Sequence, residues 1–431
     1  ETPIESIMYY PCKEKPKASD WTEFTDGKWG GYDKWAWFKT DFSLPDKFKG
    51  RAVVLKLVTG PDNQWNADNP QFEAYIDGKA VQAFDTNHYY MHLTEKAEGG
   101  EHFSIEFFGY SARKHKLMDF KPMLYTIDYE AECLYYNIFV ALRAAEMYDM
   151  DNDYRINIEK YITKALNLLD MRGLPCDEPS AEYIKSVELA NEYMEKEFYG
   201  GYCKRNSNIV NCIGHTHIDV AWQWTIEQTR QKAVRSFSTA LMLMDRYPEF
   251  KFMSSQPQLY QYVKEEQPEM YERIKKRVAE GRWEIDGAMW LEADCNLISG
   301  ESFIRQIVQG KKFIKDEFGV KSKMLWLPDV FGYAASMPQI LTKCGIDTFV
   351  TSKISWSEFN PMPHQTFNWR GIDGTEIFTQ FIMGGYENEA LGNKDKWFQT
   401  YTGQIYPNSL QYAWEHYNDK NINNEIMSTI G

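Results

Sequence analysis

The stretch Ile213–Trp222, IGHTHIDVAW, decides how this chain is interpreted. It continues a largely apolar run, 209–213 (IVNCI), that is typical of a short buried strand. Side chains two residues apart on a strand share a face, so His215, His217 and Asp219 are predicted to point the same way. Two imidazoles and a carboxylate on one face are donors that zinc accepts. The alternative is a polar strand end with ordinary hydrogen-bonded histidines, which is disfavoured because only 8 histidines occur in the chain.

Length and charge narrow the class of protein. A chain of 431 residues is long enough for two or three domains with a sizeable core. The net charge of −14 disfavours a nucleic-acid partner, because a polyanion would be repelled. Aromatic residues make up 16% of the chain, which suits ring stacking on sugars and ordinary core packing alike. No apolar run approaches the roughly 18 residues that span a bilayer, so we expect no membrane partner.

The cysteines indicate a reducing compartment. The chain has 7, at positions 12, 133, 176, 203, 212, 295 and 344. Their odd number and scattered spacing match neither a disulfide framework nor a zinc finger, so we expect a cytoplasmic protein. The chain starts at Glu1 without an initiator Met or a signal peptide. We interpret it as trimmed, so the lack of a targeting segment is weak grounds for location.

Residues 1–128 predict a small β-sandwich. Short aromatic and β-branched runs at 35–42, 52–57, 72–76 and 102–108 are typical of strands, and Asp77-Gly78 predicts a tight hairpin turn. Such an accessory domain resembles carbohydrate-binding modules. The sandwich alone does not show that it binds sugar, and a purely structural role is favoured.

Residues 129–204 predict a helical linker. Apolar side chains recur there at spacings of three and four, and the Gly200-Gly201 pair marks its end. The positions that carry this pattern are Leu134, Ile138, Leu142, Ala145, Ile158, Ile162, Ala165, Leu169, Val187, Ala190 and Met194.

Residues 205–431 alternate strand and helix patterns, which predicts an α/β fold with parallel strands covered by helices. One helix carries Ala233, Phe237, Leu241 and Met244 on one face. Polar clusters follow directly after the strands, as active-site loops do at the carboxyl ends of a barrel. Spacing alone does not decide between seven strands and eight, or between a barrel and an open sheet.

Two motifs carry a family resemblance: HTHIDVAW at 215–222 and WLPDVFGY at 326–333. With EGRWE at 280–284, MWLEADCN at 289–296 and SGES at 299–302, the chain from about 205 onward resembles glycoside hydrolase family 38, in its cytosolic and bacterial branch. The resemblance implies a (β/α)7 barrel in 205–431, truncated at its C-terminus. It implies a retaining, zinc-dependent α-mannosidase that hydrolyses terminal α-mannosides of oligosaccharides through a covalent glycosyl-enzyme intermediate, and it leaves a homo-oligomer open.

A retaining glycosidase uses two carboxyl groups about 5 Å apart, one as nucleophile and one as acid/base. The family pattern assigns the nucleophile to Asp329 and one zinc ion to His217, Asp219 and Asp329. Zinc can hold vicinal sugar hydroxyls and keep the nucleophile ionised. The alternative role for Asp329, after Pro328, is the N-cap of a helix.

Further positions follow from the resemblance. Trp222 and Phe331 match aromatic residues that wall the sugar subsite, and Lys353 matches a basic residue beside the nucleophile; a core or surface role is the alternative. A polar cluster after a strand is expected to bind sugar hydroxyls, and it comprises Glu292, Asp294 and Asn296. His215 is expected not to bind the metal itself but to contact and orient the residues that do.

One departure sets the expectation for this chain. The family's fourth ligand, a His in an HD-xx-G motif, has no counterpart between 332 and 431, and the acid/base carboxyl of this branch is expected beyond Gly431. We therefore expect an N-terminal part of a longer enzyme that is inactive alone and binds zinc weakly or not at all. Two other classes remain as alternatives: a non-catalytic carbohydrate-binding fragment, and a metal-dependent amidohydrolase-type barrel, which would need more histidines.

Overall fold

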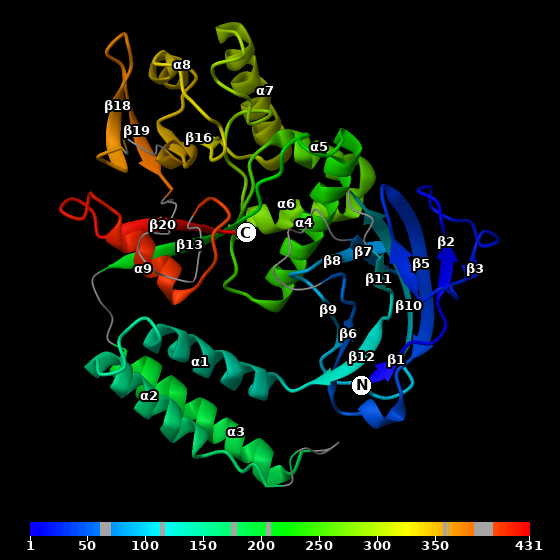
Figure 1. Cartoon of the computed structure of the whole chain (residues 1–431). Coiled ribbons are helices and arrows are strands. Elements are labelled where there is room, and N and C mark those ends of the chain that lie inside the picture. The colour runs from blue at the N-terminus through cyan, green and yellow to red at the C-terminus, as the bar shows by residue number, and fades with distance from the viewer. Residues whose placement is uncertain are drawn as a thin grey trace. The chain divides into compact units, whose positions relative to one another are not determined.

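The computed structural model describes residues 1–60, 70–112, 117–172, 174, 179–203, 208–356, 360, 362–382 and 400–431. They form a mixed α/β structure with several sheets (Figure 1). The chain divides into two compact units. The first unit holds Glu1–Asp128, Val220–Glu249 and Gln261–Ile274, and the second holds Tyr129–Asp219, Phe250–Tyr260 and Lys275–Gly431. The domain boundaries expected at 128 and 204 stay a prediction.

The first unit contains antiparallel sheets. The larger has the order β3-β2-β5-β10-β7-β8, a second has the order β1-β12-β6-β9, and β11 pairs with β4. The strands of the larger sheet are β2 (Met8–Tyr10), β3 (Thr22–Glu23), β5 (Lys34–Ser43), β7 (Gln71–Ile76), β8 (Lys79–Phe84) and β10 (His102–Ser111). The other strands are β1 (Thr2–Pro3), β4 (Lys28–Gly30), β6 (Ala52–Lys56), β9 (Tyr90–Thr94), β11 (Leu117–Asp119) and β12 (Met123–Ile127), and a 3-10 turn η1 spans Asp46–Phe48.

The turn between β7 and β8 is the hairpin predicted from Asp77-Gly78. Asp77 has φ 51° and Gly78 has φ 76°, and Ile76 lies opposite Lys79 across the turn. Two successive residues with positive φ form a turn whose twist matches that of the flanking strands, and glycine tolerates this backbone without a steric penalty. The local sequence therefore sets the register of this pair, which is confirmed.

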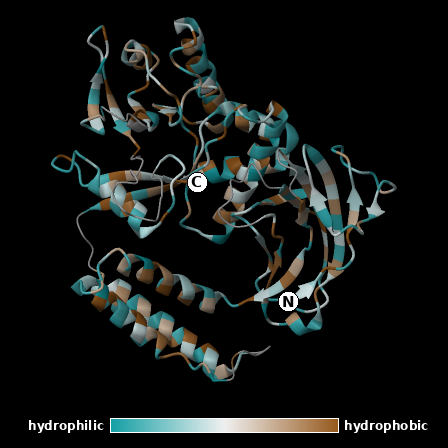
Figure 2. Cartoon of the chain, in the orientation of Figure 1, coloured by the Kyte–Doolittle hydropathy of each residue, from teal (hydrophilic) through white to brown (hydrophobic). Residues whose placement is uncertain are grey.

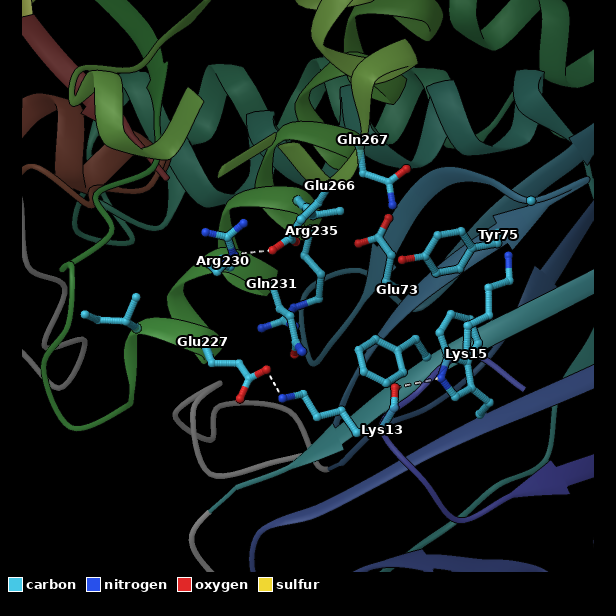
Figure 3. Close-up of a pocket in the computed structure, with 15 residues that line it drawn as sticks. Lys13, Lys15, Glu73, Tyr75, Glu227, Arg230, Gln231, Arg235, Glu266 and Gln267 are labelled. Atoms are coloured by element: carbon cyan, nitrogen blue, oxygen red, sulfur yellow. Dashed lines mark hydrogen bonds and ion pairs between the residues drawn. The ribbon is translucent and has the colours of Figure 1, made fainter. Parts of the chain in front are cut away.

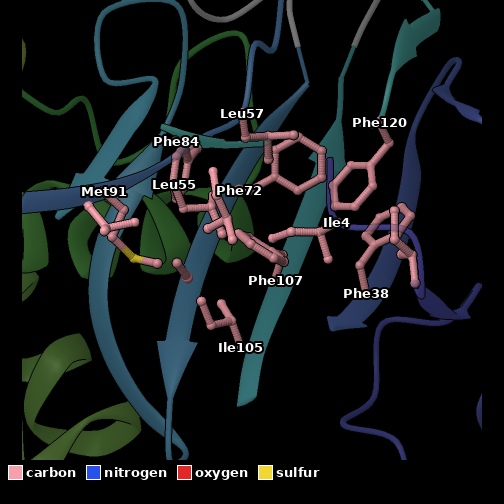
Figure 4. Close-up of a cluster of buried hydrophobic side chains, with 14 of the residues drawn as sticks. Ile4, Phe38, Leu55, Leu57, Phe72, Phe84, Met91, Ile105, Phe107 and Phe120 are labelled. Atoms are coloured by element: carbon pink, nitrogen blue, oxygen red, sulfur yellow. The ribbon is translucent and has the colours of Figure 1, made fainter. Parts of the chain in front are cut away.

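One cluster of buried apolar side chains takes members from both larger sheets of this unit (Figure 4). Phe38, Phe72 and Phe107 of the larger sheet and Leu55 of the other are all 0% exposed. Phe38 also stacks on Phe120, with ring centroids 3.9 Å apart. Burying side chains of this size supplies most of the stability of a small β-structure.

Helix α4 (Ile226–Arg246) belongs to this unit and begins at a capping box formed by Thr225 and Gln228. The predicted apolar face is confirmed, because all four of its residues are buried: Ala233, Phe237, Leu241 and Met244. α4 also forms hydrogen bonds with strands of the larger sheet. Thr239 Oγ1 accepts from the Ala83 amide at 3.1 Å, and Arg235 Nη2 donates to Gln71 Oε1 at 2.8 Å.

In the second unit, the helices predicted in 129–204 are present. They are α1 (Tyr129–Ala145), α2 (Asp153–Leu166), α3 (Ala181–Tyr193) and a π-helical turn η3 (Met194–Tyr202). Hydrophobic and hydrophilic residues alternate along α1, α2 and α3 (Figure 2), and their buried apolar side chains form one cluster that includes Leu134, Ile158 and Val187. The π-helical turn ends where Cys203 N–H donates to Phe198 O at 2.8 Å.

Parallel strands follow. β20-β13-β14-β15 form one sheet and β16-β17-β19 another, with β18 antiparallel at its edge. An isolated parallel bridge between Gly287 and Leu325 joins the segment after β15 to β16. Their bounds are β13 (Ile209–His215), β14 (Phe252–Met253), β15 (Trp283–Glu284), β16 (Met324–Leu327), β17 (Thr348–Thr351), β18 (Thr366–Arg370), β19 (Glu376–Phe381) and β20 (Glu425–Ile430).

Helices separate these strands along the chain, as the alternating pattern predicts. They are α5 (Pro257–Glu266), α6 (Pro268–Ala279), α7 (Gly300–Phe318), α8 (Met337–Lys343), the 3-10 turn η4 (Lys353–Trp356) and α9 (Pro407–Glu415). Within the described ranges, no helix is both long and apolar enough to cross a bilayer. The cysteines that the structure describes are all unpaired, while Cys176 lies outside the described residues.

Candidate active site and metal centre

The candidate site lies where parallel strands of the second unit end. His217 follows β13, Asp329 follows β16 and Lys353 follows β17, each within a few residues of the last strand position. Because parallel strands present their carboxyl ends at one edge, side chains far apart in sequence converge there. The segment before β20 adds Tyr401 to the same place, since its ring lies edge-on to His217 at 5.2 Å.

The three predicted metal ligands lie together. One side-chain atom from each of His217, Asp219 and Asp329 falls within 4.8 Å of the others. His217 Nε2 is 3.1 Å from Asp219 Oδ1 and 3.6 Å from Asp329 Oδ2. A tetrahedral zinc ion with bonds of about 2.0–2.1 Å separates its ligand atoms by about 3.3 Å. The spacing of these donors therefore fits a zinc ion, and Nε2 is the histidine nitrogen that faces it.

The other nitrogen of His217 faces a buried carboxylate. Nδ1 lies 3.2 Å from Glu292 Oε2, and the two side chains are 8% and 5% exposed. Ser255 Oγ in turn donates to Glu292 Oε1 at 2.5 Å. Nδ1 and Oε2 are both buried and neither has a hydrogen-bond partner among the described residues, so their contact is an ion pair. This arrangement favours the tautomer with a proton on Nδ1, which leaves the Nε2 lone pair directed at Asp219 and Asp329.

The carboxylates control the charge of His217. Burial by itself lowers the pKa of this histidine, but Glu292 and Asp219 outweigh burial and raise the pKa to about 10. A cation at this position is therefore strongly favoured, whether a proton or a metal ion. His215 behaves differently: burial lowers its pKa to about 4, and its Nδ1–H donates to the Met253 carbonyl at 3.0 Å.

Asp329 has two further neighbours. Lys353 Nζ forms an ion pair with Asp329 Oδ1, the contact that a lysine steadying this carboxylate requires. Tyr401 hydrogen-bonds to Asp329, and burial followed by this bond raises the pKa of the Tyr401 hydroxyl. Its phenol therefore keeps its proton and donates to the carboxylate. Both contacts fix the orientation of the Asp329 side chain.

The remaining predicted sugar-binding residues differ in exposure and in their contacts. Phe331 is 76% exposed, with Lys353 Nζ 4.9 Å from its ring centre, so its face is available to a ligand. Asp294 accepts from the Asn296 amide at 2.8 Å and closes a turn, and the Asn296 side chain is exposed. Trp222 belongs to the first unit and is 54% exposed.

Three residues of the site were not predicted: Ser255, Gln256 and Tyr401. Gln256 is 4% exposed, has φ 61°, and its Nε2 donates to the Ile218 carbonyl at 2.9 Å, which fixes the chain between His217 and Asp219. The available signal for Ser255 and Gln256 is their place directly after the run 250–253 (FKFM), since polar residues that follow a strand are typical of active-site loops. Tyr401 carried no such signal, since it stands outside any strand pattern.

Comparison with known proteins decides the family. The domain described as "Glycosyl hydrolases family 38 N-terminal domain" matches residues 208–431. This chain belongs to glycosyl hydrolase family 38. The resemblance inferred from HTHIDVAW and WLPDVFGY is thereby confirmed for the region that holds the site.

Relatives of this family 38 chain include α-mannosidases from distant eukaryotes. It is 45% identical to "Alpha-mannosidase G" of Dictyostelium discoideum over 216 residues, which is 50% of this chain and 20% of that protein. It is 33% identical to "Alpha-mannosidase" of Saccharomyces cerevisiae over 374 residues, 81% of this chain and 33% of that protein. It is 42% identical to human "Alpha-mannosidase 2C1" over 191 residues, 44% of this chain and 18% of that protein. The chain thus matches between 18% and 33% of these relatives' lengths.

Proposed function

We propose that this protein is a retaining, zinc-dependent α-mannosidase that removes terminal α-mannosyl residues from oligosaccharides. The observation that carries the proposal is the convergence of His217 Nε2, Asp219 and Asp329 at the spacing of a zinc site, in a chain of family 38. The names of its relatives, all α-mannosidases, support the substrate class.

We assign the metal to His217, Asp219 and Asp329, because their donor atoms fit zinc in type and spacing. When bound, zinc would polarise sugar hydroxyls and offset the negative charge of the carboxylates. Glu292 is a positioning residue in this proposal. It accepts the Nδ1 proton of His217 and so turns the Nε2 lone pair toward the metal position.

Asp329 is the proposed nucleophile. Its side chain is 18% exposed, so a substrate can reach it, and the ion pair with Lys353 fixes its orientation. Attack on the anomeric carbon would form a bond from a carboxylate oxygen to the sugar and release the aglycone oxygen. That leaving oxygen must receive a proton from an acid/base group, which we do not assign. Phe331, with its exposed ring, is the proposed wall of the sugar subsite, together with Asp294 and Asn296. The sugar-binding role of Trp222 stays a prediction.

The architecture we propose joins the observed parallel strands into the (β/α)7 barrel of the family. Counting across the Gly287–Leu325 bridge, the parallel order is β20, β13, β14, β15, β16, β17 and β19, which supports a seven-stranded barrel. The shared apolar core of the two larger sheets supports a β-sandwich within 1–128. Unpaired cysteines support a cytoplasmic location. A homo-oligomer stays a proposal that the parts described here do not test.

The test uses the longest natural form of the protein that includes residues 1–431. Zinc content and hydrolysis of an aryl α-mannoside are measured on one sample, before and after chelation, and the configuration of the first product is followed by NMR. We expect metal-dependent release of α-mannose. Binding of mannosides without hydrolysis would favour a non-catalytic carbohydrate-binding protein, and metal-dependent amide hydrolysis would favour an amidohydrolase.

A further inference from the structure

The first unit contains a cavity of about 720 Å³ between its larger sheet and helix α4 (Figure 3). This volume lies within the roughly 300–1,000 Å³ of sites that bind small molecules. The sheet contributes the aromatic side chains Trp37, Tyr75 and Phe108 and the carboxylate of Glu73. The opposite wall comes from α4 and from the residues near 266–267, which include Gln231 and Gln267.

Strand register places the aromatic wall and the carboxylate side by side. Phe108 of β10 lies directly opposite Trp37 of β5 on one side and Glu73 of β7 on the other. Directly opposite residues project from the same face of a sheet, so these three form one row across it. Trp37 stacks on Phe108 at 4.7 Å and contacts Tyr75 at 5.5 Å. The row therefore ends in a carboxylate beside a continuous aromatic surface.

Glu73 accepts no hydrogen bond, although Arg235 lies close enough to favour its charge. It is 3% exposed, and neither carboxylate oxygen has a hydrogen-bond partner among the described residues. Ser238 lies beside it, but the Ser238 hydroxyl donates to the Arg235 carbonyl at 2.9 Å. Arg235 in turn donates to Gln71 at 2.8 Å. A buried carboxylate that accepts no hydrogen bond is costly, so its retention points to a donor that arrives from the cavity.

The cations around the cavity already have partners. Lys13 pairs with Glu227, and Arg230 pairs with Glu266 (Figure 3). Lys15 pairs with Glu106 at 3.7 Å, and Arg235 interacts with Glu73, so each cation of the lining has an acidic neighbour. A ligand cation would meet the same lysine and arginine on its way to Glu73. The cavity instead offers a two-oxygen acceptor, amide groups that donate and accept, and flat rings, which together match a neutral ligand with adjacent hydroxyls and apolar C–H faces.

We propose that this cavity is a second, non-catalytic carbohydrate site, in which Glu73 accepts two adjacent hydroxyls of a pyranose whose C–H face lies on the wall of Trp37, Tyr75 and Phe108. The inference does not rest on the proposed function, because no residue of the metal centre belongs to the cavity.

The test is a ligand-observed NMR titration of the 431-residue chain carrying His217→Ala, so that sugar bound at the metal centre does not contribute. The probes are methyl α-D-mannopyranoside, methyl β-D-glucopyranoside and methyl β-D-galactopyranoside, with choline and inorganic phosphate as charged probes. We expect saturable binding of at least one pyranoside. Adding Glu73→Gln should weaken it about tenfold or more, because an amide NH2 group replaces one of the two oxygens.

Two variants complete the design. Gln231→Trp fills the cavity from α4 and should abolish binding, and Trp37→Ala should weaken it. The control is Tyr90→Ala, an aromatic residue of β9 in the other sheet and outside the cavity lining, which should leave binding unchanged. If Trp37→Ala fails to fold, Glu73→Gln and Gln231→Trp still decide the matter. Absence of saturable binding, binding indifferent to both of these substitutions, or Glu73-dependent binding of choline or phosphate in place of sugar would overturn the proposal.

Discussion

Replacing Glu292 by glutamine tests how the metal centre is held together. Glutamine keeps the shape of the side chain and one acceptor oxygen, but it removes the negative charge that lies 3.2 Å from His217 Nδ1. A hydrogen bond to a charged group contributes about 1.5–3 kcal/mol. Loss of a carboxylate that orients a metal-binding histidine typically weakens metal binding 10–100-fold, which is about 1.4–2.7 kcal/mol. The two estimates agree, so we expect the zinc dissociation constant of Glu292→Gln to rise 10–100-fold.

Protonation must be separated from this effect. His217 binds zinc only after it loses the proton from Nε2, and the pKa of His217 is about 10, so the apparent zinc affinity should increase as the pH rises toward that value. Without the charge of Glu292 the pKa of His217 falls, and the rise should end at a lower pH. Zinc affinity is therefore measured by chelator competition at several pH values, and the pH-independent constants are compared.

The control is Asp294→Asn, a carboxylate two positions away that accepts backbone amides and makes no described contact with His217. It should leave zinc affinity unchanged. Ser255→Ala, which removes the donor to Glu292, should lie between the control and Glu292→Gln. If Glu292→Gln binds zinc as tightly as wild type at every pH, the assignment of Glu292 as the positioning residue of His217 is refuted.

Three further predictions follow from the same contacts. Asp329→Asn should lower turnover of an aryl α-mannoside by roughly 10³-fold or more in the longest natural form, since no carboxylate remains to attack, and trapping with a 5-fluoro-mannosyl fluoride followed by peptide mapping should label Asp329 and not Glu292. His217→Ala should remove bound zinc and activity together, measured on one dialysed sample; full activity without metal would contradict the zinc assignment. Burial raises the pKa of Glu73 to about 8 from 4.5, so its contribution to stability is present below pH 4.5 and is lost at about 1.4 kcal/mol per pH unit as the pH rises toward 8. Glu73→Gln should remove this slope between pH 5 and pH 8 in urea unfolding, and identical slopes in the two proteins would show that burial does not raise the pKa of Glu73.

Local sequence determined the elements and the chemistry of the metal ligands. His217 and Asp219, two residues apart just after β13, do lie in one group of donor atoms, while His215 at the same spacing does not belong to it. The Asp77-Gly78 hairpin and the apolar face of α4 were equally predictable, because each depends on backbone preferences or periodicity within a single element. Asp329 could be named only through the family resemblance, because nothing in its local pattern shows that it lies near His217.

Tertiary structure decided which distant residues meet. The predicted binding of sugar hydroxyls by Glu292 stays a prediction. Its contacts with His217 Nδ1 and Ser255 appear only in the tertiary structure, where the ends of neighbouring strands lie together. Tyr401 reaches Asp329 from a segment with no strand pattern of its own. Such contacts depend on the length of each loop and on where neighbouring strands end. Neither can be inferred from residue spacing within one segment.

The residues that line the cavity of the first unit are brought together only by tertiary structure. Trp37, Phe108 and Glu73 become neighbours through the registers of two antiparallel strand pairs, and a shift of one residue would turn each side chain to the opposite face. The sequence determined that these strands are aromatic and that one of them carries a glutamate. Pairing between distant strands, together with the packing of α4 over their outer face, determined that the glutamate is buried beside the rings without a hydrogen-bond partner, because only that packing excludes the water that would otherwise solvate it.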